Sequence, residues 1–252
     1  MTAYHQAAQS PLRAKTMYLK KLPTTILVII LSVAVIGSCD RKTRGFSQAE
    51  LALIHGSDSI MRVLTIEDVS DSIILRKISS ELPDEALLSS DYDRLTKLMV
   101  ATVKDPSQGG VGIAGPQVGI NRRIIAVQRF DKDPIHSNGM PDYPFEVYPN
   151  ARIIWASDSL VSGPEGCLSV PDRKSEVLRS HKIVIEYAVV GKTEAGYVKD
   201  HGNISGSAGN KREEKDNIRT ISMVRDTISG FTAVIFQHEI DHLDGILYTD
   251  RI

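Results

Sequence analysis

Two histidines near the end of the chain constrain the fold more than any other feature. They lie in FQHEIDHLDG, residues 236–245, where His238 and His242 are four residues apart. On a helix this spacing puts both imidazoles on one face, one turn above the other, where they can hold one metal ion. Glu239, beside the first histidine, can then reach a water on that ion. The pattern predicts a helix with a metal site whose third ligand comes from elsewhere in the chain.

Length and composition indicate an ordinary globular protein. The chain has 252 residues, enough for one large or two small domains, and is 42% hydrophobic and 24% charged. Its net charge is −1, with no basic excess for nucleic acid and no acidic block. Composition therefore predicts no nucleic-acid partner.

The front of the chain reads as a leader, residues 1–39. Residues 26–36, ILVIILSVAVI, form an apolar run that follows Lys20 and Lys21. A spanning helix needs about 20 apolar residues, so this run better fits the hydrophobic segment of a secretory signal. The alternatives are a buried strand and a signal anchor that is never cleaved.

The end of this run adds a second indication. Residues 36–39, IGSC, resemble the lipobox of bacterial lipoproteins, in which the cysteine is lipidated and becomes the mature N-terminus. We therefore predict membrane attachment through lipidated Cys39 and an exported or membrane-anchored location, with a cytoplasmic location as the alternative. Met17 would give a more usual signal length than Met1.

The remaining residues, 40–252, contain both helical and β-rich patterns. Ser47 and Gly56 delimit a short helical pattern, and residues 91–105 place apolar side chains at helical spacing. A second long helix is predicted within residues 227–243. Three β-rich runs read as strands: residues 122–130, 152–156 and 182–190.

Residues 191–217 are polar and rich in Gly, Ser, Asn, Lys and Glu. This composition predicts an extended surface hairpin or a disordered loop. His201 within it is better read as an exposed loop histidine than as a metal ligand.

Two further segments carry side chains suited to chemistry. Residues 109–119, GGVGIAGPQVG, lack the Lys-Ser/Thr pair of a phosphate loop, and Gln117 offers an amide donor there. In EGCLS, residues 165–169, Cys167 follows a glycine and is sterically accessible, although a buried structural cysteine is the alternative. Cys167 and Cys39 are the only cysteines and form no disulfide framework.

Taken together, GVGIAGPQVG, EGCLS and QHEIDHLDG resemble the three motifs of the peptide deformylases, in the same order and at similar separations. The resemblance covers roughly residues 60–252 and includes three flanking segments: ILRKIS at 74–79, VPDRKSEVLR at 170–179 and GILYTDR at 245–251.

This resemblance implies an α+β fold in which antiparallel sheets surround a central helix that carries the HExxH motif. It implies one divalent metal ion held by Cys167, His238 and His242, with water in the fourth position. The family favours Fe²⁺, and an exported copy that meets oxygen would favour Zn²⁺.

The implied substrate is an N-formylmethionyl peptide or nascent chain, which is hydrolysed to formate and a free amine. Glu239 would move the proton, and the Gln117 amide and the Leu168 backbone N–H would stabilise the oxyanion. Asp241 would steady the ligand-bearing helix. Four residues would bind substrate: Val111, Gly112, Phe231 and Val234. For Val111, Phe231 and Val234, simple core packing is the alternative.

Two departures and two rival functions qualify this resemblance. Gly115 stands where the family usually has alanine, which we interpret as a minor change, and the polar segment at 191–217 is longer than usual. One rival is an exported, catalytically weak lipoprotein that binds formyl-peptides or metal; the intact base and ligands argue against it. The other, a zincin-type protease, needs a third His or Glu ligand, and none follows His242.

Overall fold

The computed structural model describes residues 45–137, 140–193 and 218–252. The predicted leader at 1–39, with Cys39, and most of the polar segment, with His201, lie outside the described residues. Among the described helices, none is both long enough and apolar enough to cross a membrane.

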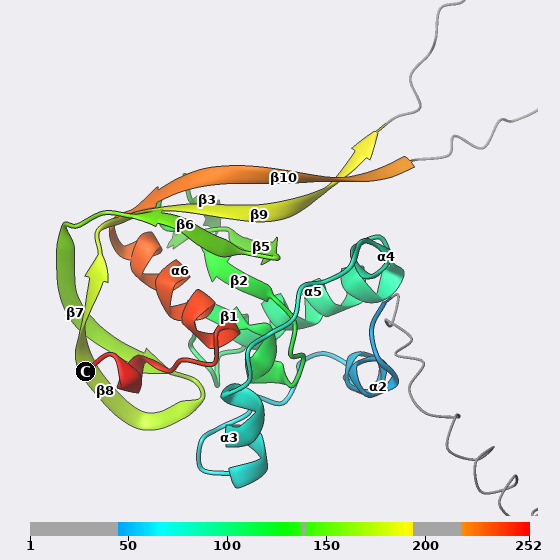
Figure 1. Cartoon of the computed structure of the whole chain (residues 1–252), viewed down its shortest axis with the longest axis horizontal. Helices are drawn as coiled ribbons and strands as arrows, with labels where there is room; N and C mark the ends of the chain where they lie inside the picture. Colours follow the sequence, from blue (N-terminus) through cyan, green and yellow to red (C-terminus); the bar gives the residue numbers. More distant parts are fainter. Residues whose placement is uncertain (1–44, 138–139, 194–217) are drawn as a thin grey trace, which may run out of the picture. The chain divides into compact units, whose positions relative to one another are not determined.

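The helices of the described residues lie between residues 48 and 104 and near the C-terminal end (Figure 1). They are α2 (Gln48–Gly56), α3 (Val69–Leu75), α4 (Asp84–Leu87), α5 (Ser90–Lys104) and α6 (Gly230–Leu243), with 3-10 turns η1 (Gly115–Val118) and η2 (Tyr248–Asp250).

All the strand pairs are antiparallel. One sheet has the order β1–β2–β5, formed by Gly112–Ala114, Ile124–Gln128 and Phe145–Pro149. Another has the order β10–β9–β6, formed by Ile218–Ser229, Lys182–Thr193 and Arg152–Ala156. Two hairpins complete the set: β3 (Ile135–Ser137) with β4 (Met140–Asp142), and β7 (Leu160–Cys167) with β8 (Val170–Ser180).

Strand β2 lies between two helices, which explains its continuous apolar sequence. Successive side chains of a strand point to opposite faces. Ile124 and Ala126 join the core cluster that contains the buried face of α5, whereas Ile125 and Val127 join the cluster that contains α6. Both faces of this strand are therefore buried, and α6 lies among the strands (Figure 1).

The observed fold confirms the predicted class, α+β with antiparallel sheets around the helix that carries HExxH. Helix α2 begins after Ser47 with a full capping box, as its sequence predicts. The boundaries of the last helix were wrong: α6 begins at Gly230, because Thr227–Ser229 pair with β9 as the end of β10.

Other boundaries also differ from the predictions. The strand predicted at 122–130 spans only Ile124–Gln128. The strand predicted at 182–190 continues to Thr193, where residues 191–193 pair with 218–220. The start of the polar segment at 191–217 is thus part of a hairpin, which was one of the two structures predicted for this segment. The β7–β8 hairpin, which the sequence patterns did not predict, carries Cys167 at the end of its first strand.

Candidate metal centre

Three side chains from two distant segments converge beside α6. The sulfur of Cys167 and one ring nitrogen from each of His238 and His242 all lie within 4.8 Å of one another, and Cys167 Sγ is 3.2 Å from His242 Nε2. In a tetrahedral zinc site with bonds of about 2.3 Å to sulfur and 2.0–2.1 Å to nitrogen, such atoms stand about 3.5 Å apart. The Cys167–His242 separation is close to that value, and all three atoms are near enough to approach one ion. Sulfur and imidazole donors suit zinc, iron and similar ions.

Glu165 fixes the orientation of His238. Its Oε2 lies 2.8 Å from His238 Nδ1, which leaves the other ring nitrogen to face Cys167. Burial alone would lower the pKa of His238, but hydrogen bonds to Cys167 and Glu165 outweigh it and raise that pKa to about 10. The groups that stabilise a positive charge on the His238 ring would also stabilise a metal cation between Cys167, His238 and His242.

His242 has the opposite tendency. It is almost fully buried, and this burial, with the positive charges of His238 and Arg179 nearby, holds its pKa well below the ordinary value. The imidazole is therefore neutral, which is the form that binds metal.

Arg179 links Glu165 to Asp241 beneath the two histidines. Its guanidinium donates to both oxygens of Glu165, at 2.7 and 2.9 Å, and to Asp241 Oδ2 at 2.5 Å. Burial would raise the pKa of Glu165, but the hydrogen bonds from Arg179 and His238 lower it to about 2. Asp241 also accepts from Arg251 at 2.6 and 3.1 Å. This arrangement supports the steadying role expected for Asp241.

Gln117 directs its amide nitrogen at the sulfur. Its Oε1 accepts a hydrogen bond from the Ala114 N–H at 2.8 Å, so Nε2 faces the other way. That nitrogen lies 3.6 Å from Cys167 Sγ and donates to Ser169 Oγ at 3.2 Å. A side-chain donor is thus held next to the three converging atoms.

Glu239 is a buried carboxyl with an unused oxygen. It is 4% exposed, and its Oε2 has no hydrogen-bond partner among the described residues. Burial raises the pKa of Glu239 to about 7, although the positive charge of His238 opposes this. A carboxyl of that kind can take up and release protons near neutral pH.

The absence of a side chain at Gly112 makes room for this carboxyl. A Cβ there would lie 2.5 Å from Glu239 Oε1 and 2.9 Å from Cγ and Cδ. Gly112, predicted to bind substrate, lines the cavity and also packs directly against Glu239.

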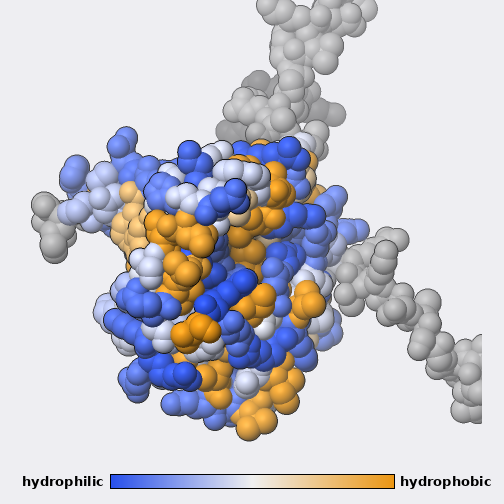
Figure 2. All heavy atoms as spheres, turned by 60° about the vertical axis from the view of Figure 1, so that its left-hand side comes forward, coloured by the Kyte–Doolittle hydropathy of each residue, from blue (hydrophilic) through white to orange (hydrophobic). Residues whose placement is uncertain are grey.

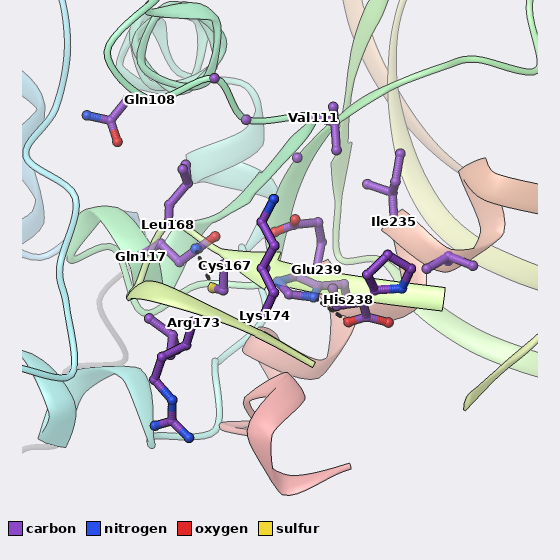
Figure 3. Close-up of a pocket in the computed structure, with 18 of the residues that line it drawn as sticks. Gln108, Val111, Gln117, Cys167, Leu168, Arg173, Lys174, Ile235, His238 and Glu239 are labelled. Carbon is purple, nitrogen blue, oxygen red and sulfur yellow. Dashed lines mark hydrogen bonds and ion pairs between the residues drawn. The ribbon is translucent and has the colours of Figure 1, made fainter. Parts of the chain in front are cut away.

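A cavity of about 750 Å³ is bordered by five of these side chains: Gln117, Glu165, Cys167, His238 and Glu239 (Figure 3). That volume is within the usual range for small-molecule and cofactor sites. Phe231 is 59% exposed and Val234 is only partly buried, so neither is a simple core residue. All four predicted substrate-binding residues and Leu168 border the cavity: Val111, Gly112, Phe231 and Val234.

Several residues of the site were not singled out from the sequence. Glu165 and Arg179 stood inside the quoted motifs, but no local pattern shows that they pair across the β7–β8 hairpin. Ile235 lies on the helix face shared with the first histidine, and helical spacing from His238 could have indicated it. Gln108, Arg173 and Lys174 line the cavity without any local signal.

Glycine at position 115, where the family usually has alanine, matters more than the minor change that we expected. It does not border the cavity; a Cβ there would lie 2.6 Å from the Ile120 carbonyl oxygen and 2.7 Å from that of Arg122. Backbone atoms cannot move aside as a side chain can, so alanine does not fit this local backbone without rearrangement.

Comparison with known proteins agrees with this geometry. The polypeptide deformylase family model matches residues 61–198 and 216–252. A peptide deformylase from Leptospira biflexa is 30% identical over 179 residues, covering 71% of this chain and 82% of that protein. Peptide deformylase 2 from Nostoc is 34% identical over 174 residues, covering 67% of this chain and 75% of that protein.

Solved structures give the same result. The class I type b peptide deformylase from Acinetobacter baumannii, with Met-Ala-Ser bound, is 30% identical with a TM-score of 0.54, covering 77% of this chain and 98% of that chain. Peptide deformylase from Thermotoga maritima, at 23% identity and a TM-score of 0.54, supports the fold alone. Because the family model matches well over half of its residues, the chain belongs to the peptide deformylase family.

Proposed function

We propose that this chain hydrolyses the formyl group of N-formylmethionyl peptides with one divalent metal ion held by Cys167, His238 and His242. The observation that carries this proposal is the approach of one sulfur and two ring nitrogens to within 4.8 Å, beside a buried carboxyl that lines a cavity of about 750 Å³. Membership of the family supports a hydrolase over the catalytically weak binding protein considered from the sequence.

A divalent ion at this site supplies Lewis-acid chemistry, which makes hydroxide available near neutral pH. The protein's own groups do the rest. Glu239 takes the proton from the attacking water through its unpartnered Oε2 and returns it to the departing amine. Its raised pKa, about 7, suits both transfers.

Gln117 and Leu168 stabilise the charge that develops on the formyl oxygen. The amide nitrogen of Gln117 is already held toward Cys167 by the bond from Ala114 to its oxygen, so it needs no reorganisation. Leu168 is the residue next to Cys167 and lines the same cavity, so its backbone N–H is the second donor proposed for this oxygen. Loss of one such donor typically costs about 2.7–4 kcal/mol of transition-state stabilisation.

The methionine side chain enters the apolar part of the cavity. Val111, Phe231 and Val234 border it, and Phe231 packs on Phe130 with ring centroids 5.4 Å apart. On the face shown in Figure 2, hydrophobic residues gather in a central band between hydrophilic ones.

We propose Fe²⁺ as the ion, with Zn²⁺ as the alternative, because both accept sulfur and imidazole ligands. Anaerobic purification from cells grown without added metal, followed by elemental analysis, decides between them. Iron at one equivalent per chain supports the proposal, and zinc at one equivalent contradicts it.

The deciding experiment for the activity replaces the proposed base. Glu239→Ala should retain the metal, because Glu239 is not among the three converging side chains, and should lower kcat on formyl-Met-Ala-Ser by at least about 10²–10⁴-fold. Glu176→Ala, on the exposed face of β8, is the matched carboxylate control. A Glu239→Ala protein that keeps the parent rate would refute this assignment.

We further propose that residues 1–39 export the chain or anchor it to a membrane through lipidated Cys39. This proposal rests on the sequence alone. Cell fractionation tests it: a lipidated, active chain in the membrane fraction supports it, whereas recovery only in the cytosol with Met1 intact contradicts it.

A further inference from the structure

A three-residue bulge in β8, with the residue that follows it, places two cations at the edge of the cavity. Cys167 pairs with Val170, but its neighbour Gly166 pairs with Lys174, so residues 171–173 have no partners in β7. Bulges of this kind bend a strand and redirect its side chains. Asp172, Arg173 and Lys174 are exposed and line the cavity.

Two contacts hold this bulge in place. The hydroxyl of the buried Tyr248 donates to the Arg173 carbonyl oxygen at 2.9 Å. A Cβ at Gly166 would meet Lys174 Cγ at 3.4 Å and Cε at 3.6 Å, so the aliphatic part of Lys174 lies over Gly166. The lysine side chain is therefore supported beside Cys167.

The two cations point in different directions. In the view of Figure 3, the Lys174 side chain lies between Cys167 and Glu239, with its ammonium at the end directed away from its own strand. Arg173 points away from these residues. Lys174 is thus the cation directed at a peptide in the cavity.

No protein carboxylate satisfies Lys174. Within the described parts of the chain, no salt bridge engages it, and Glu165 is already paired with Arg179 and His238. The wall formed by Gln108, Gly109 and Gly110 carries no charge. Asp172, the one carboxylate on the bulge, is likewise not paired with Lys174 among the described residues.

We infer that Lys174 is a specificity-determining residue that binds a carboxylate on the third residue of the formylated peptide. The inference rests on the proposed function. The carboxylate has two sources: the C-terminus of a short peptide, or an Asp or Glu side chain. The first would make short peptides released by peptide-bond hydrolysis preferred substrates, because the end of a nascent chain is esterified and carries no free carboxylate.

The test compares kcat/KM for four peptides: formyl-Met-Ala-Ala as acid and as amide, formyl-Met-Ala-Glu-amide and formyl-Met-Ala-Lys-amide. An exposed ion pair is worth up to about 1 kcal/mol, so a carboxylate should raise kcat/KM by about fivefold over the neutral amide. The gain should appear in KM, because the ammonium does not touch the reacting atoms. Preference for the free acid identifies the C-terminus as its source, and preference for the glutamate peptide identifies the side chain.

Variants distinguish a specific contact of Lys174 with the peptide carboxylate from a general effect of positive charge near the cavity. Lys174→Gln should abolish the preference, and Lys174→Glu should reverse it in favour of the lysine peptide. Arg173→Gln, which removes a neighbouring charge that points elsewhere, should keep it. Equal hydrolysis of all four peptides by the parent, or a preference that survives Lys174→Gln, overturns this inference alone. Hydrolysis of none of them overturns the proposed function as well.

Discussion

Replacing Gly112 with alanine should disable the base without removing the metal. The new Cβ would lie 2.5 Å from Glu239 Oε1, which is 0.9 Å closer than the 3.4 Å at which ordinary contact begins. Glu239 is 4% exposed and encloses the same Cβ position with Cγ and Cδ at 2.9 Å, so its carboxyl must shift by about that amount.

A shift of about 1 Å in a catalytic group can cost about 10²-fold in rate. We therefore expect kcat of Gly112→Ala on formyl-Met-Ala-Ser to fall by about 10²-fold. Overpacking should also lower the free energy of unfolding by about 1–3 kcal/mol. The three metal-binding side chains are untouched, so metal content should remain at one equivalent.

The assay measures kcat by formate release, metal by elemental analysis and stability by urea unfolding. Gly163→Ala is the matched control, because a Cβ there meets nothing within 4 Å, and it should match the parent in all three. Full activity of metal-loaded Gly112→Ala would show that the position of Glu239 does not set the rate.

Three further predictions concern the surroundings of the site. Glu165→Gln should weaken metal affinity by about 10–100-fold, measured by competition with a chelator, because its carboxylate orients His238; unchanged affinity would contradict that role. Gly115→Ala should lower the free energy of unfolding by about 1–3 kcal/mol through contact with backbone carbonyls, and an unchanged urea midpoint would show that the backbone yields freely. Burial would raise the pKa of Glu50, but hydrogen bonds from Arg122 and Ser47 lower this pKa below the ordinary value of 4.5. The ionised Glu50 therefore stabilises the folded protein above pH 4.5, and this stabilisation is lost as the pH falls through the lowered pKa of the folded state. Urea unfolding between pH 6 and 3 should therefore show a shallower loss of stability for Glu50→Gln, and equal slopes would refute this.

Local patterns predicted much of the fold. The spacing of Leu95, Leu98 and Val103 predicts the helix seen as α5, and the continuous apolar run of β2 follows from burial on both faces. Strand β10 was missed because its last residues run directly into the sequence of α6, and a periodic pattern does not reveal where pairing with β9 ends.

Some features of the site could likewise be predicted from local sequence patterns, and others could not. The pairing of His238 with His242 follows from helical spacing alone. The approach of Cys167 to them, 75 positions from His242 along the chain, was expected only from the resemblance. Neither source predicts the packing of Gly112 on Glu239, since it depends on how β1 meets α6 in three dimensions.

The central claim is that Cys167, His238 and His242 bind one metal ion, and X-ray absorption spectroscopy of the purified protein tests it most directly. The ion should have one sulfur neighbour at about 2.3 Å and nitrogen neighbours at about 2.0–2.1 Å if it is zinc, at one equivalent per chain. Cys167→Ser should lose the sulfur signal. Active protein that holds no metal, or a metal without a sulfur neighbour, would contradict the account.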